Sequence, residues 1–329
     1  MSTDALVSAF DALLSDLDGV VYAGPHAIPG AIEALKALAG HQVALGYVTN
    51  NASRTPAQVA AHLRELGAPA EDHQVVSSSQ AAATLLADLL PAGANVMITG
   101  SAALAEEIRA VGLNPVKSQE DDPVAVVQGF DPGLGWKDLA EAAFVVTSGA
   151  HWVATNTDMS IPQARGIAPG NGTLVAAVAA ATGQQPRVAG KPEAPLFREA
   201  ARRLSATRPL VVGDRLDTDI LGGNNAGFAT VAVLTGVDTR ESILAARTAE
   251  RPTFLIADLP GLYLQYPDIR EEQGTFLCGS ASATVIGPAV HINGSTNDLD
   301  SWRAGCAAWW AAHPDTEIAT EPDVVWAGH

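Results

Sequence analysis

Short apolar runs alternate with amphipathic stretches along the first part of the chain. The run from Ala12 to Leu17 leads into Asp-Gly, and the run from Gln42 to Val48 leads into Thr-Asn-Asn. A short apolar run followed by turn-forming residues is typical of a buried strand in a parallel sheet. Between the two runs, Ala31 to Leu38 carries apolar residues at helical spacing. The pattern therefore predicts a strand, a helix and a second strand.

The alternation continues beyond the second strand. Thr55 and Pro56 suit the N-cap and the first position of a helix that stops at Gly67. A strand over Gln74 to Ser77 and an Ala-rich helix over Gln80 to Leu90 follow. Repeated strand–helix units predict an open parallel sheet with helices on both faces.

A second set of alternating elements begins near residue 95. It includes the apolar runs Asn95 to Thr99, Val124 to Gln128 and Phe144 to Thr147, where we expect strands, and a helix over Thr173 to Ala181. We expect this block, residues 91–184, to form a smaller α/β domain of its own.

The first pattern resumes after this block. Strands are predicted over Leu210 to Val212 and Thr230 to Leu234, with a helix over Asp219 to Asn225 that ends at Gly227 in the C-cap position. The smaller domain is therefore predicted to be inserted into the first. The predicted fold class is α/β: a doubly wound, Rossmann-like parallel-sheet core (residues 1–90 plus 185–260) with an inserted α/β domain (91–184) and an extension (261–329).

The extension differs in composition from the rest of the chain. It holds four of the six Trp residues and a predicted helix over Asp298 to Ala312, so we expect a small α+β unit. Two hypotheses account for Trp302, Trp309, Trp310 and Trp326. They form the core of the extension, or they serve a homodimer contact or a second ligand site, because clustered Trp is also common in interfaces.

Composition narrows the class of protein. The 329 residues are 47% hydrophobic and 17% charged, which suits a packed globular protein. The net charge of −17 disfavours nucleic acid and anionic membranes as partners. The N-terminus lacks the basic start of a secretory signal, and no apolar run approaches the ~20 residues that span a bilayer. Cys278 and Cys306 provide neither a disulfide framework nor a Cys-x-x-Cys pair, so we expect a cytoplasmic protein.

Four polar clusters stand after predicted strands or in short loops. Open α/β sheets bind ligands at the carboxyl ends of their strands. Asp16 and Asp18 are two positions apart in an extended chain, so both carboxylates can face one crevice and suit a metal or an acid/base pair. Taken singly, each cluster also fits a turn, a capped strand end, a loop cation or a helix N-cap with acids in its first turn. The clusters are Asp16-Leu17-Asp18-Gly19, Val48-Thr49-Asn50-Asn51, Gly190-Lys191-Pro192 and Gly213-Asp214-Arg215-Leu216-Asp217-Thr218-Asp219.

Together, and in this order, the four clusters resemble the four motifs of the haloacid dehalogenase superfamily. Asp-Leu-Asp-Gly-Val-Val-Tyr, Val-Thr-Asn-Asn-Ala-Ser-Arg-Thr, Gly-Lys-Pro and Gly-Asp-Arg-Leu-Asp-Thr-Asp-Ile are similar to the NagD-like, 4-nitrophenylphosphatase branch, subclass IIA. Only 31 positions separate Asp18 from Thr49, too few for a helical cap domain, whereas 141 separate Asn50 from Lys191, enough for an α/β cap. The resemblance covers residues 10–240 and implies that the inserted block is that cap.

The resemblance implies a Mg²⁺-dependent phosphatase that hydrolyses a small phosphomonoester through an aspartyl-phosphate. Asp16 would attack phosphorus, and Asp18 would protonate the leaving group and then deprotonate the hydrolytic water. Asp16, the carbonyl of Asp18 and the carboxylate of Asp214 would bind Mg²⁺. Asp219 would hold a metal-bound water or orient Lys191.

The phosphoryl oxygens need partners in so acidic a protein. By the same resemblance, Thr49, Asn50 and Lys191 would bind them, with Asn51 beside them, and Thr49 and Lys191 would count among the catalytic residues. In the cap, substrate choice is expected at the loop positions Gly129-Phe130-Asp131, Asn156-Thr157-Asp158 and Arg165, with Asn156 and Arg165 as candidate substrate contacts. The family accepts small phosphomonoesters such as glycerol phosphate, phosphoglycolate, nucleotides and pyridoxal phosphate, and the sequence does not choose among them.

Other functions find less support in the residues. A P-loop is absent because Lys191 is followed by Pro, and Gly170-Asn171-Gly172 lacks the third Gly of a dinucleotide motif. The eight His residues show no metal-ligand or triad-like grouping. The alternatives that stay open are a phosphotransferase or phosphomutase of the same superfamily and a non-catalytic phosphometabolite-binding protein.

Overall fold

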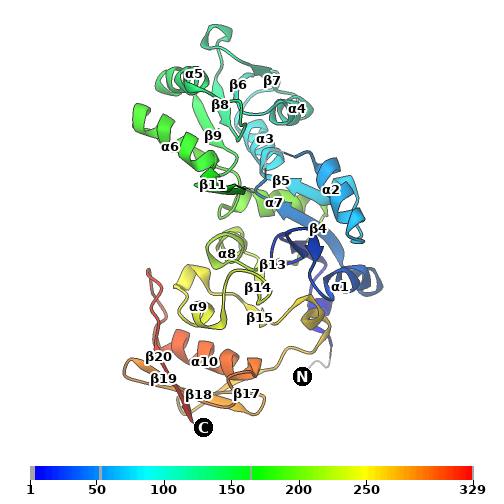
Figure 1. The fold of residues 1–329 in the computed structure, drawn as a ribbon, viewed down its shortest axis with the longest axis vertical. Coiled ribbons are helices and arrows are strands. Elements are labelled where there is room, and N and C mark those ends of the chain that lie inside the picture. The colour runs from blue at the N-terminus through cyan, green and yellow to red at the C-terminus, as the bar shows by residue number, and fades with distance from the viewer. Residues whose placement is uncertain (1–3, 52–53, 164, 328–329) are drawn as a thin grey trace. The chain divides into compact units, whose positions relative to one another are not determined.

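A computed structural model describes residues 4–51, 54–163 and 165–327. The chain forms two compact units. The first holds the residues up to Leu45, Leu66–Pro69 and the chain from Leu204 onward; the second holds Gly46–Glu65 and Ala70–Arg203. The elements of each are drawn in Figure 1. The boundary between the units falls within a single strand, so neither unit is one continuous stretch of chain.

The larger sheet has six strands in the order β15-β14-β13-β1-β4-β5. Ser15 lies opposite Val212 in the parallel pair β1 and β13, so these two strands end side by side. The chain runs from β1 to β4 and β5 on one side and then returns to β13 on the other, which makes the ends of β1 and β13 the topological switch point. The strands are β1 (Ala12–Ser15), β4 (Ala44–Thr49), β5 (Val75–Ser77), β13 (Pro209–Gly213), β14 (Ala229–Val233) and β15 (Phe254–Ile256).

The helices that the sequence predicts next to these strands lie close to the predicted positions, whereas α7 and α9 are not predicted. Thr55 caps α2 as expected: its hydroxyl oxygen accepts a hydrogen bond from the Gln58 amide (3.3 Å), and its own amide donates to the Gln58 side chain (2.9 Å). The helix predicted over Asp219 to Asn225 is a π-helical turn, η5 (Leu216–Ile220), followed by α8, and Gly227 ends it with φ of 81°. The helices are α1 (Ala31–Ala37), α2 (Pro56–Glu65), α3 (Ser78–Leu89), α7 (Ala194–Arg203), α8 (Leu221–Ala226) and α9 (Arg240–Leu244).

The second unit contains a five-stranded parallel sheet in the order β12-β9-β8-β6-β7. Its core on one face joins Met97, Val126 and Trp152 to Val145 and Val178 of helices α5 and α6. Helices α3 and α4 cover the opposite face (Figure 1). The elements are β6 (Asn95–Thr99), β7 (Asn114–Val116), β8 (Ala125–Gln128), β9 (His151–Ala154), β12 (Arg187–Val188), α4 (Ala102–Ala110), α5 (Trp136–Thr147) and α6 (Asn171–Thr182).

The strand predicted over Phe144 to Thr147 is wrong, because these residues form the last turn of α5. Val145 and Val146 are buried while Phe144 is 53% exposed, as expected for a helix with one face on the sheet. A run of four apolar residues cannot by itself distinguish a strand from a buried turn of helix.

Two small hairpins and six short 3-10 helices complete these parts. The hairpins are β2 (Tyr22–Ala23) with β3 (His26–Ala27), and β10 (Ser160–Gln163) with β11 (Gly166–Pro169). The 3-10 helices are η1 (Leu6–Ala9), η2 (Leu38–His41), η3 (Asp72–Gln74), η4 (Gln119–Asp121), η6 (Thr248–Glu250) and η7 (Leu259–Tyr263).

The C-terminal extension is α+β, as predicted. Its sheet has the order β16-β17-β18-β19-β20 and is antiparallel except for the parallel pair β19 and β20. Helix α10 packs on β17, β18 and β19. The elements are β16 (Ile269–Glu272), β17 (Thr275–Cys278), β18 (Ala281–Ile286), β19 (Ala289–Asn293), α10 (Leu299–Ala312) and β20 (Asp323–Ala327).

The Trp residues of the extension lie in a hydrophobic core. Trp302 and Trp309 are each 4% exposed, and Trp310 and Trp326 pack against the same cluster. The cluster also contains Leu216 and Ile220 of η5, Ile243 and Leu244 of α9 and Leu255 of β15. This supports the first of the two hypotheses, that the Trp side chains serve packing. It also means that the extension shares its core with the turn that carries Asp219.

The helices of the described residues are too short or too polar to cross a membrane.

Candidate active site

Three carboxylates meet at the switch point of the larger sheet. Asp16 directly follows β1, Asp214 directly follows β13, and Asp219 lies in η5. One oxygen of each lies within 4.8 Å of the others. Asp214 is 3% exposed and Asp219 is 1% exposed. The structure thus brings together three of the four acids that the sequence analysis proposed as metal ligands.

Main-chain amides hold two of these carboxylates in place, and the backbone of the third residue is tied to β13. The amide of Val237 donates to Oδ2 of Asp214 (2.8 Å), and the amide of Arg215 donates to Oδ2 of Asp219 (3.3 Å). The Asp16 amide donates to the carbonyl of Val212 across the strand pair (3.0 Å). Hydrogen bonds from N–H groups stabilise the charged form of a carboxylate.

The loop after β14 approaches Asp214 so closely that it tolerates no side chain. A Cβ atom on Gly236 would lie 1.9 Å from Oδ2 of Asp214. Sequence analysis missed Gly236 and the Val237 amide, because nothing in the local pattern shows which backbone will face a distant carboxylate.

The donor set fits a small hard cation. Three carboxylates this close repel one another, and a divalent ion with oxygen ligands removes that repulsion. The guanidinium of the nearby Arg215 donates its hydrogen bonds to Asp217 (3.0 and 2.8 Å) and interacts with Asp214 and Asp219 only through its charge. These hydrogen bonds raise the pKa of Arg215. Asp16, Asp214 and Asp219 could therefore hold Mg²⁺.

Asp18 lies in a different environment from the cluster. It is exposed, and its backbone pairs with Tyr22 in an isolated bridge. Its side chain is not part of the group formed by Asp16, Asp214 and Asp219. An exposed carboxyl at the strand end can exchange protons with water, which general acid/base work requires.

A second group of predicted residues converges on the side chain of Asn50 within the second unit. Its Oδ1 accepts a hydrogen bond from the Lys191 amide (2.7 Å), and its Nδ2 donates to the Lys191 carbonyl (3.1 Å). Gly190 permits this approach, since a Cβ there would lie 2.5 Å from Oδ1 of Asn50. Lys191 is only 4% exposed. Asn50 therefore fixes the main chain on both sides of the Lys191 side chain.

The main chain of Asn50 is held as firmly as its side chain. Its carbonyl accepts hydrogen bonds from the Ser78 hydroxyl (2.8 Å) and from Nδ2 of Asn156 (2.9 Å). Asn156 is 4% exposed, and its Oδ1 accepts from the Asp158 amide (3.2 Å). The contacts of Asn156 are thus with the main chain of the network, which is a positioning arrangement.

Sequence analysis misses Ser78 of this network, and it names the stretch Asn156-Thr157-Asp158 without giving Asp158 a role of its own. The Asp158 carboxylate accepts from Nδ2 of Asn50 at 3.2 and 3.4 Å. A signal existed for Asp158, because Asn156 and Asp158 stand two positions apart after a buried strand, the same spacing as Asp16 and Asp18. No comparable signal marks Ser78, which lies in a run of three serines at the start of α3.

The remaining predicted residues lie at three further positions. Thr49 ends β4 at 8% exposure, and its hydroxyl accepts from the Asn51 amide (3.1 Å). Asn51 is exposed beside it. Arg165 is exposed in the turn between β10 and β11.

Fold and site together define a class of protein: a doubly wound α/β enzyme with an acidic centre at the switch point of its larger sheet. Family models agree with this class. Residues 13–114 match the family described as haloacid dehalogenase-like hydrolase, and residues 188–262 match the HAD-hydrolase-like family.

Individual relatives agree with the family models. D-glycerol 3-phosphate phosphatase of Mycobacterium tuberculosis is 49% identical over 259 residues, 79% of this chain and 72% of that protein. A crystal structure of glycerol phosphate phosphatase from the same organism in complex with magnesium superposes with a TM-score of 0.85 at 42% identity, over 100% of this chain and 96% of that one.

A more distant solved structure matches a smaller share of this chain. p-Nitrophenyl phosphatase from Archaeoglobus fulgidus gives a TM-score of 0.69 at 30% identity, over 77% of this chain and 98% of that one. The chain belongs to the haloacid dehalogenase-like hydrolases and is a hydrolase of the phosphatase type. The solved structures to which it is similar include a p-nitrophenyl phosphatase.

Proposed function

We propose that this chain is a Mg²⁺-dependent phosphatase of small polyol and sugar phosphomonoesters, with glycerol 3-phosphate the first substrate to test. The observation that carries the proposal is the carboxylate cluster of the half-buried Asp16 and the buried Asp214 and Asp219 at the ends of β1 and β13. Similarity to a D-glycerol 3-phosphate phosphatase supports the substrate class.

Asp16 is the nucleophile in this proposal. Its carboxylate oxygen attacks phosphorus, the bond from phosphorus to the ester oxygen breaks, and Asp16 carries the phosphoryl group. The Val212 carbonyl accepts from the Asp16 amide, which ties the nucleophile to the end of β13. A nucleophile fixed to two strands loses little freedom on reaction.

Asp18 moves the protons. Its carboxyl gives a proton to the departing ester oxygen, and the resulting carboxylate then takes a proton from water. That water attacks phosphorus, which releases inorganic phosphate and restores the Asp16 carboxylate. Exposure of Asp18 supports this role, because the group must exchange protons twice in each turnover.

Asp16, Asp214 and Asp219 hold Mg²⁺, and the carbonyl of Asp18 is proposed as a further ligand. Bound Mg²⁺ supplies positive charge against the negative charge that develops on the phosphoryl oxygens. The magnesium complex of a 42% identical phosphatase supports this choice of ion. Asp219 stands among the ligands in this proposal because its oxygen lies within the same 4.8 Å cluster.

Thr49, Asn51 and Lys191 are proposed to bind the phosphoryl oxygens, and Asn50, which the sequence also suggested for this role, is proposed instead to act through Lys191. Both polar atoms of the Asn50 side chain form hydrogen bonds, with the main chain of Lys191 and with the Asp158 carboxylate. We therefore propose that Asn50 positions Lys191. A buried lysine whose main chain is fixed in this way is preorganised for an anion.

The domain assignment remains part of the proposal. We propose residues 91–184 as the cap that sets substrate choice, residues 1–90 and 185–260 as the catalytic core, and residues 261–329 as an extension that supports η5. Arg165, exposed in the β10–β11 turn, is the proposed substrate contact of the cap, whereas Asn156 acts through Asn50.

We place the enzyme in the cytoplasm, with small phosphomonoesters as its partners. Cys278 and Cys306 are free and buried, and burial raises the pKa of both thiols to about 12. Such thiols suit a reducing compartment. The net charge of −17 argues against nucleic acid as a partner.

A phosphate-release assay tests the proposal. The purified full chain is incubated with D- and L-glycerol 3-phosphate, phosphoglycolate, hexose phosphates, a nucleoside monophosphate and 4-nitrophenyl phosphate, with Mg²⁺ or with EDTA. We expect Mg²⁺-dependent release with the highest kcat/KM on a polyol or sugar phosphate. Absence of Mg²⁺-dependent release from every ester would refute the activity, and preference for the nucleotide would refute the substrate class.

A further inference from the structure

The smaller sheet has a switch point of its own, which the proposed phosphatase chemistry does not use. In the order β12-β9-β8-β6-β7, the chain goes from β6 to β7 on one side and returns to β8 on the other. The reversal lies between β6 and β8, whose carboxyl ends lead into Gly100-Ser101 and into Gly129-Phe130-Asp131. Crevices at such reversals are preferred ligand sites in open α/β sheets.

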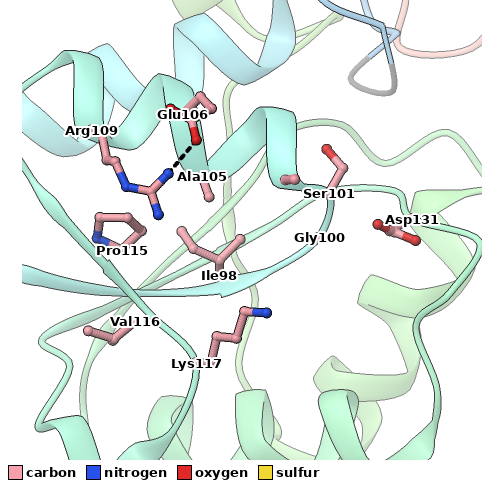
Figure 2. Close-up of a pocket in the computed structure, with 11 residues that line it drawn as sticks. Ile98, Gly100, Ser101, Ala105, Glu106, Arg109, Pro115, Val116, Lys117 and Asp131 are labelled. Carbon is pink, nitrogen blue, oxygen red and sulfur yellow. Dashed lines mark hydrogen bonds and ion pairs between the residues drawn. The ribbon is translucent and has the colours of Figure 1, made fainter.

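A cavity of about 420 Å³ lies at this switch point. Its lining comes from the end of β6, one face of α4 along its length, the end of β7 with the following Lys117, and Asp131, all within the second unit (Figure 2). Cavities of about 300–1,000 Å³ are the size that holds small molecules. Neither the carboxylate cluster nor any residue of the Asn50 network lines it.

The charges in the cavity are unusual for so acidic a chain. Lysine occurs only four times in 329 residues, and Lys117 is one of these. Among the described residues the Lys117 ammonium forms no ion pair, whereas Arg109 pairs with Glu106 at 2.5 Å. Figure 2 shows this pair on α4 and Lys117 extending from the opposite wall. Lys117 is therefore the cation available to a ligand.

Ser101 and Asp131 supply further polar groups. The Ser101 oxygen accepts from the Leu104 amide (3.3 Å), so its O–H can still donate, and the first turn of α4 adds the positive end of a helix dipole. One oxygen of Asp131 accepts from the Gly133 amide (2.7 Å), which leaves the other to accept from a ligand.

The floor of the cavity is apolar, formed by Ile98, Pro115 and Val116. An apolar floor favours an organic ligand over an inorganic ion. The lining side chains carry two positive and two negative charges, so a phosphate dianion would meet Glu106 and Asp131 without matching positive charge. A single carboxylate with a neighbouring hydrogen-bond donor satisfies both Lys117 and Asp131.

We propose that this cavity, defined by Ser101, Arg109, Lys117 and Asp131 over an apolar floor, binds a small monocarboxylate that carries a hydroxyl or ammonium group near the carboxylate. The carboxylate lies at Lys117 and the first turn of α4, and the hydroxyl or ammonium group donates to Asp131. Hydroxy acids and amino acids share this chemistry. The site is an accessory one and does not depend on the proposed phosphatase reaction.

The test is a titration of the ¹⁵N-labelled full chain followed by amide chemical shifts. The probes are D-glycerate, L-serine and propionate, each at concentrations up to about 50 mM, and the first two separate the hydroxy-acid source from the amino-acid source. We expect saturable shifts confined to 98–105, 115–118 and 129–133 for at least one of glycerate and serine, and at least ten-fold weaker binding of propionate, which lacks the donor.

Charge removal at Lys117 gives the matched comparison. Lys117→Met keeps the length of the side chain and should weaken binding at least ten-fold, while Lys137→Met on α5, outside the cavity, should leave it unchanged. Equal melting temperatures of the variants ensure that the fold is intact. No saturable binding of glycerate or serine overturns the proposal. Shifts elsewhere, unaltered binding in Lys117→Met, or equal loss in Lys137→Met also overturn it.

Discussion

At the switch point of the larger sheet, β1 leads directly into the half-buried Asp16 and β13 into the buried Asp214, whereas at that of the smaller sheet, β6 and β8 lead into Gly100 and Gly129. The larger sheet places Asp16, Asp214 and Asp219 within 4.8 Å of one another. The smaller sheet surrounds its crevice with charges of both signs on exposed or half-exposed side chains.

The same topological rule therefore produces two sites of different strength. Burying several like charges is costly unless a cation compensates them, so the first site is built for tight binding of a metal. Mixed, solvent-screened charges around an apolar floor give weak and selective binding of a small organic ion. Topology decides where a ligand can bind, and the side chains at the strand ends decide what it is and how tightly it is held.

The largest effect is expected from removing the nucleophile at the first switch point. Asp16→Asn keeps the shape of the side chain but removes the attacking carboxylate, so kcat should fall by at least ~10³. Phosphate release under saturating substrate measures it. Asp217→Asn, which removes a nearby carboxylate that pairs with Arg215 outside the cluster, is the control and should stay within a few-fold of the parent. Similar losses in both variants would contradict the assignment.

A smaller effect, a loss of Mg²⁺ affinity, is expected from a substitution that displaces the Asp214 carboxylate but leaves this residue in place. Gly236→Ala places a Cβ 1.9 Å from Oδ2 of Asp214, so this carboxylate must shift. We expect Mg²⁺ affinity, measured by calorimetry on the full chain, to weaken by about ten- to a hundred-fold, since ligand geometry is demanding for Mg²⁺. Gly40→Ala meets nothing within 4 Å and is the control. Unchanged affinity in Gly236→Ala would show that Asp214 is not a ligand.

Asp158 should have a moderate effect that separates positioning from chemistry. Asp158→Ala removes the carboxylate that accepts a hydrogen bond from Asn50 Nδ2. We expect the loss of this hydrogen bond to lower kcat/KM about ten-fold. Asp158→Asn can still present a carbonyl oxygen to Nδ2, so it should recover most of the loss. We expect KM for the phosphomonoester to rise more than kcat falls. Failure of Asp158→Asn to recover activity, with Glu120→Gln unaffected as the surface control, would argue against positioning.

The smallest effect concerns stability rather than catalysis. Glu199 of α7, the helix after Lys191, is 3% exposed; burial by itself raises its pKa, but hydrogen bonds from Arg202 (2.8 Å) and Arg203 (2.6 Å) outweigh burial and hold the pKa below the ordinary 4.5. A lowered pKa stabilises the fold above pH 4.5, and this contribution disappears as the pH falls through the lower folded value.

Glu199→Gln should therefore cost about 1–3 kcal/mol at pH 7, with the difference from the parent shrinking in acid below pH 4.5. Chemical denaturation at a series of pH values measures it. A difference that stays constant from pH 7 to pH 3.5 would mean that the charge of Glu199 contributes nothing.

Much of the fold could be predicted from the sequence. The run Asn95 to Thr99 is β6, and Pro56 begins α2 with Thr55 as its cap. These features succeed because a buried strand needs a continuous apolar run and a helix start needs a side chain that accepts from its first amides. Both requirements are satisfied by residues that are neighbours in the sequence, so the local pattern of apolar and polar residues shows them.

Where the pattern was local but ambiguous, the expectation failed. Phe144 to Thr147 has the composition of a short strand, yet α5 continues through it because Val145 and Val146 complete a helical face on the sheet. The five strands of the extension were not predicted individually for a related reason. Strands β17, β18 and β19 pack on the cluster that contains Trp302 and Trp309, which come later in the chain.

The sequence by itself determined that four clusters resemble the motifs of one superfamily of hydrolases, and that Asp16 and Asp214 each follow a recognisable strand end. Only the tertiary structure decided that Asp158 accepts from Asn50, that Gly236 borders Asp214, and that Lys117 shares a cavity with Asp131. The reason is physical. Hydrophobic periodicity and capping are set by residues within one helical turn or strand, whereas a hydrogen bond across 108 positions depends on how whole elements pack.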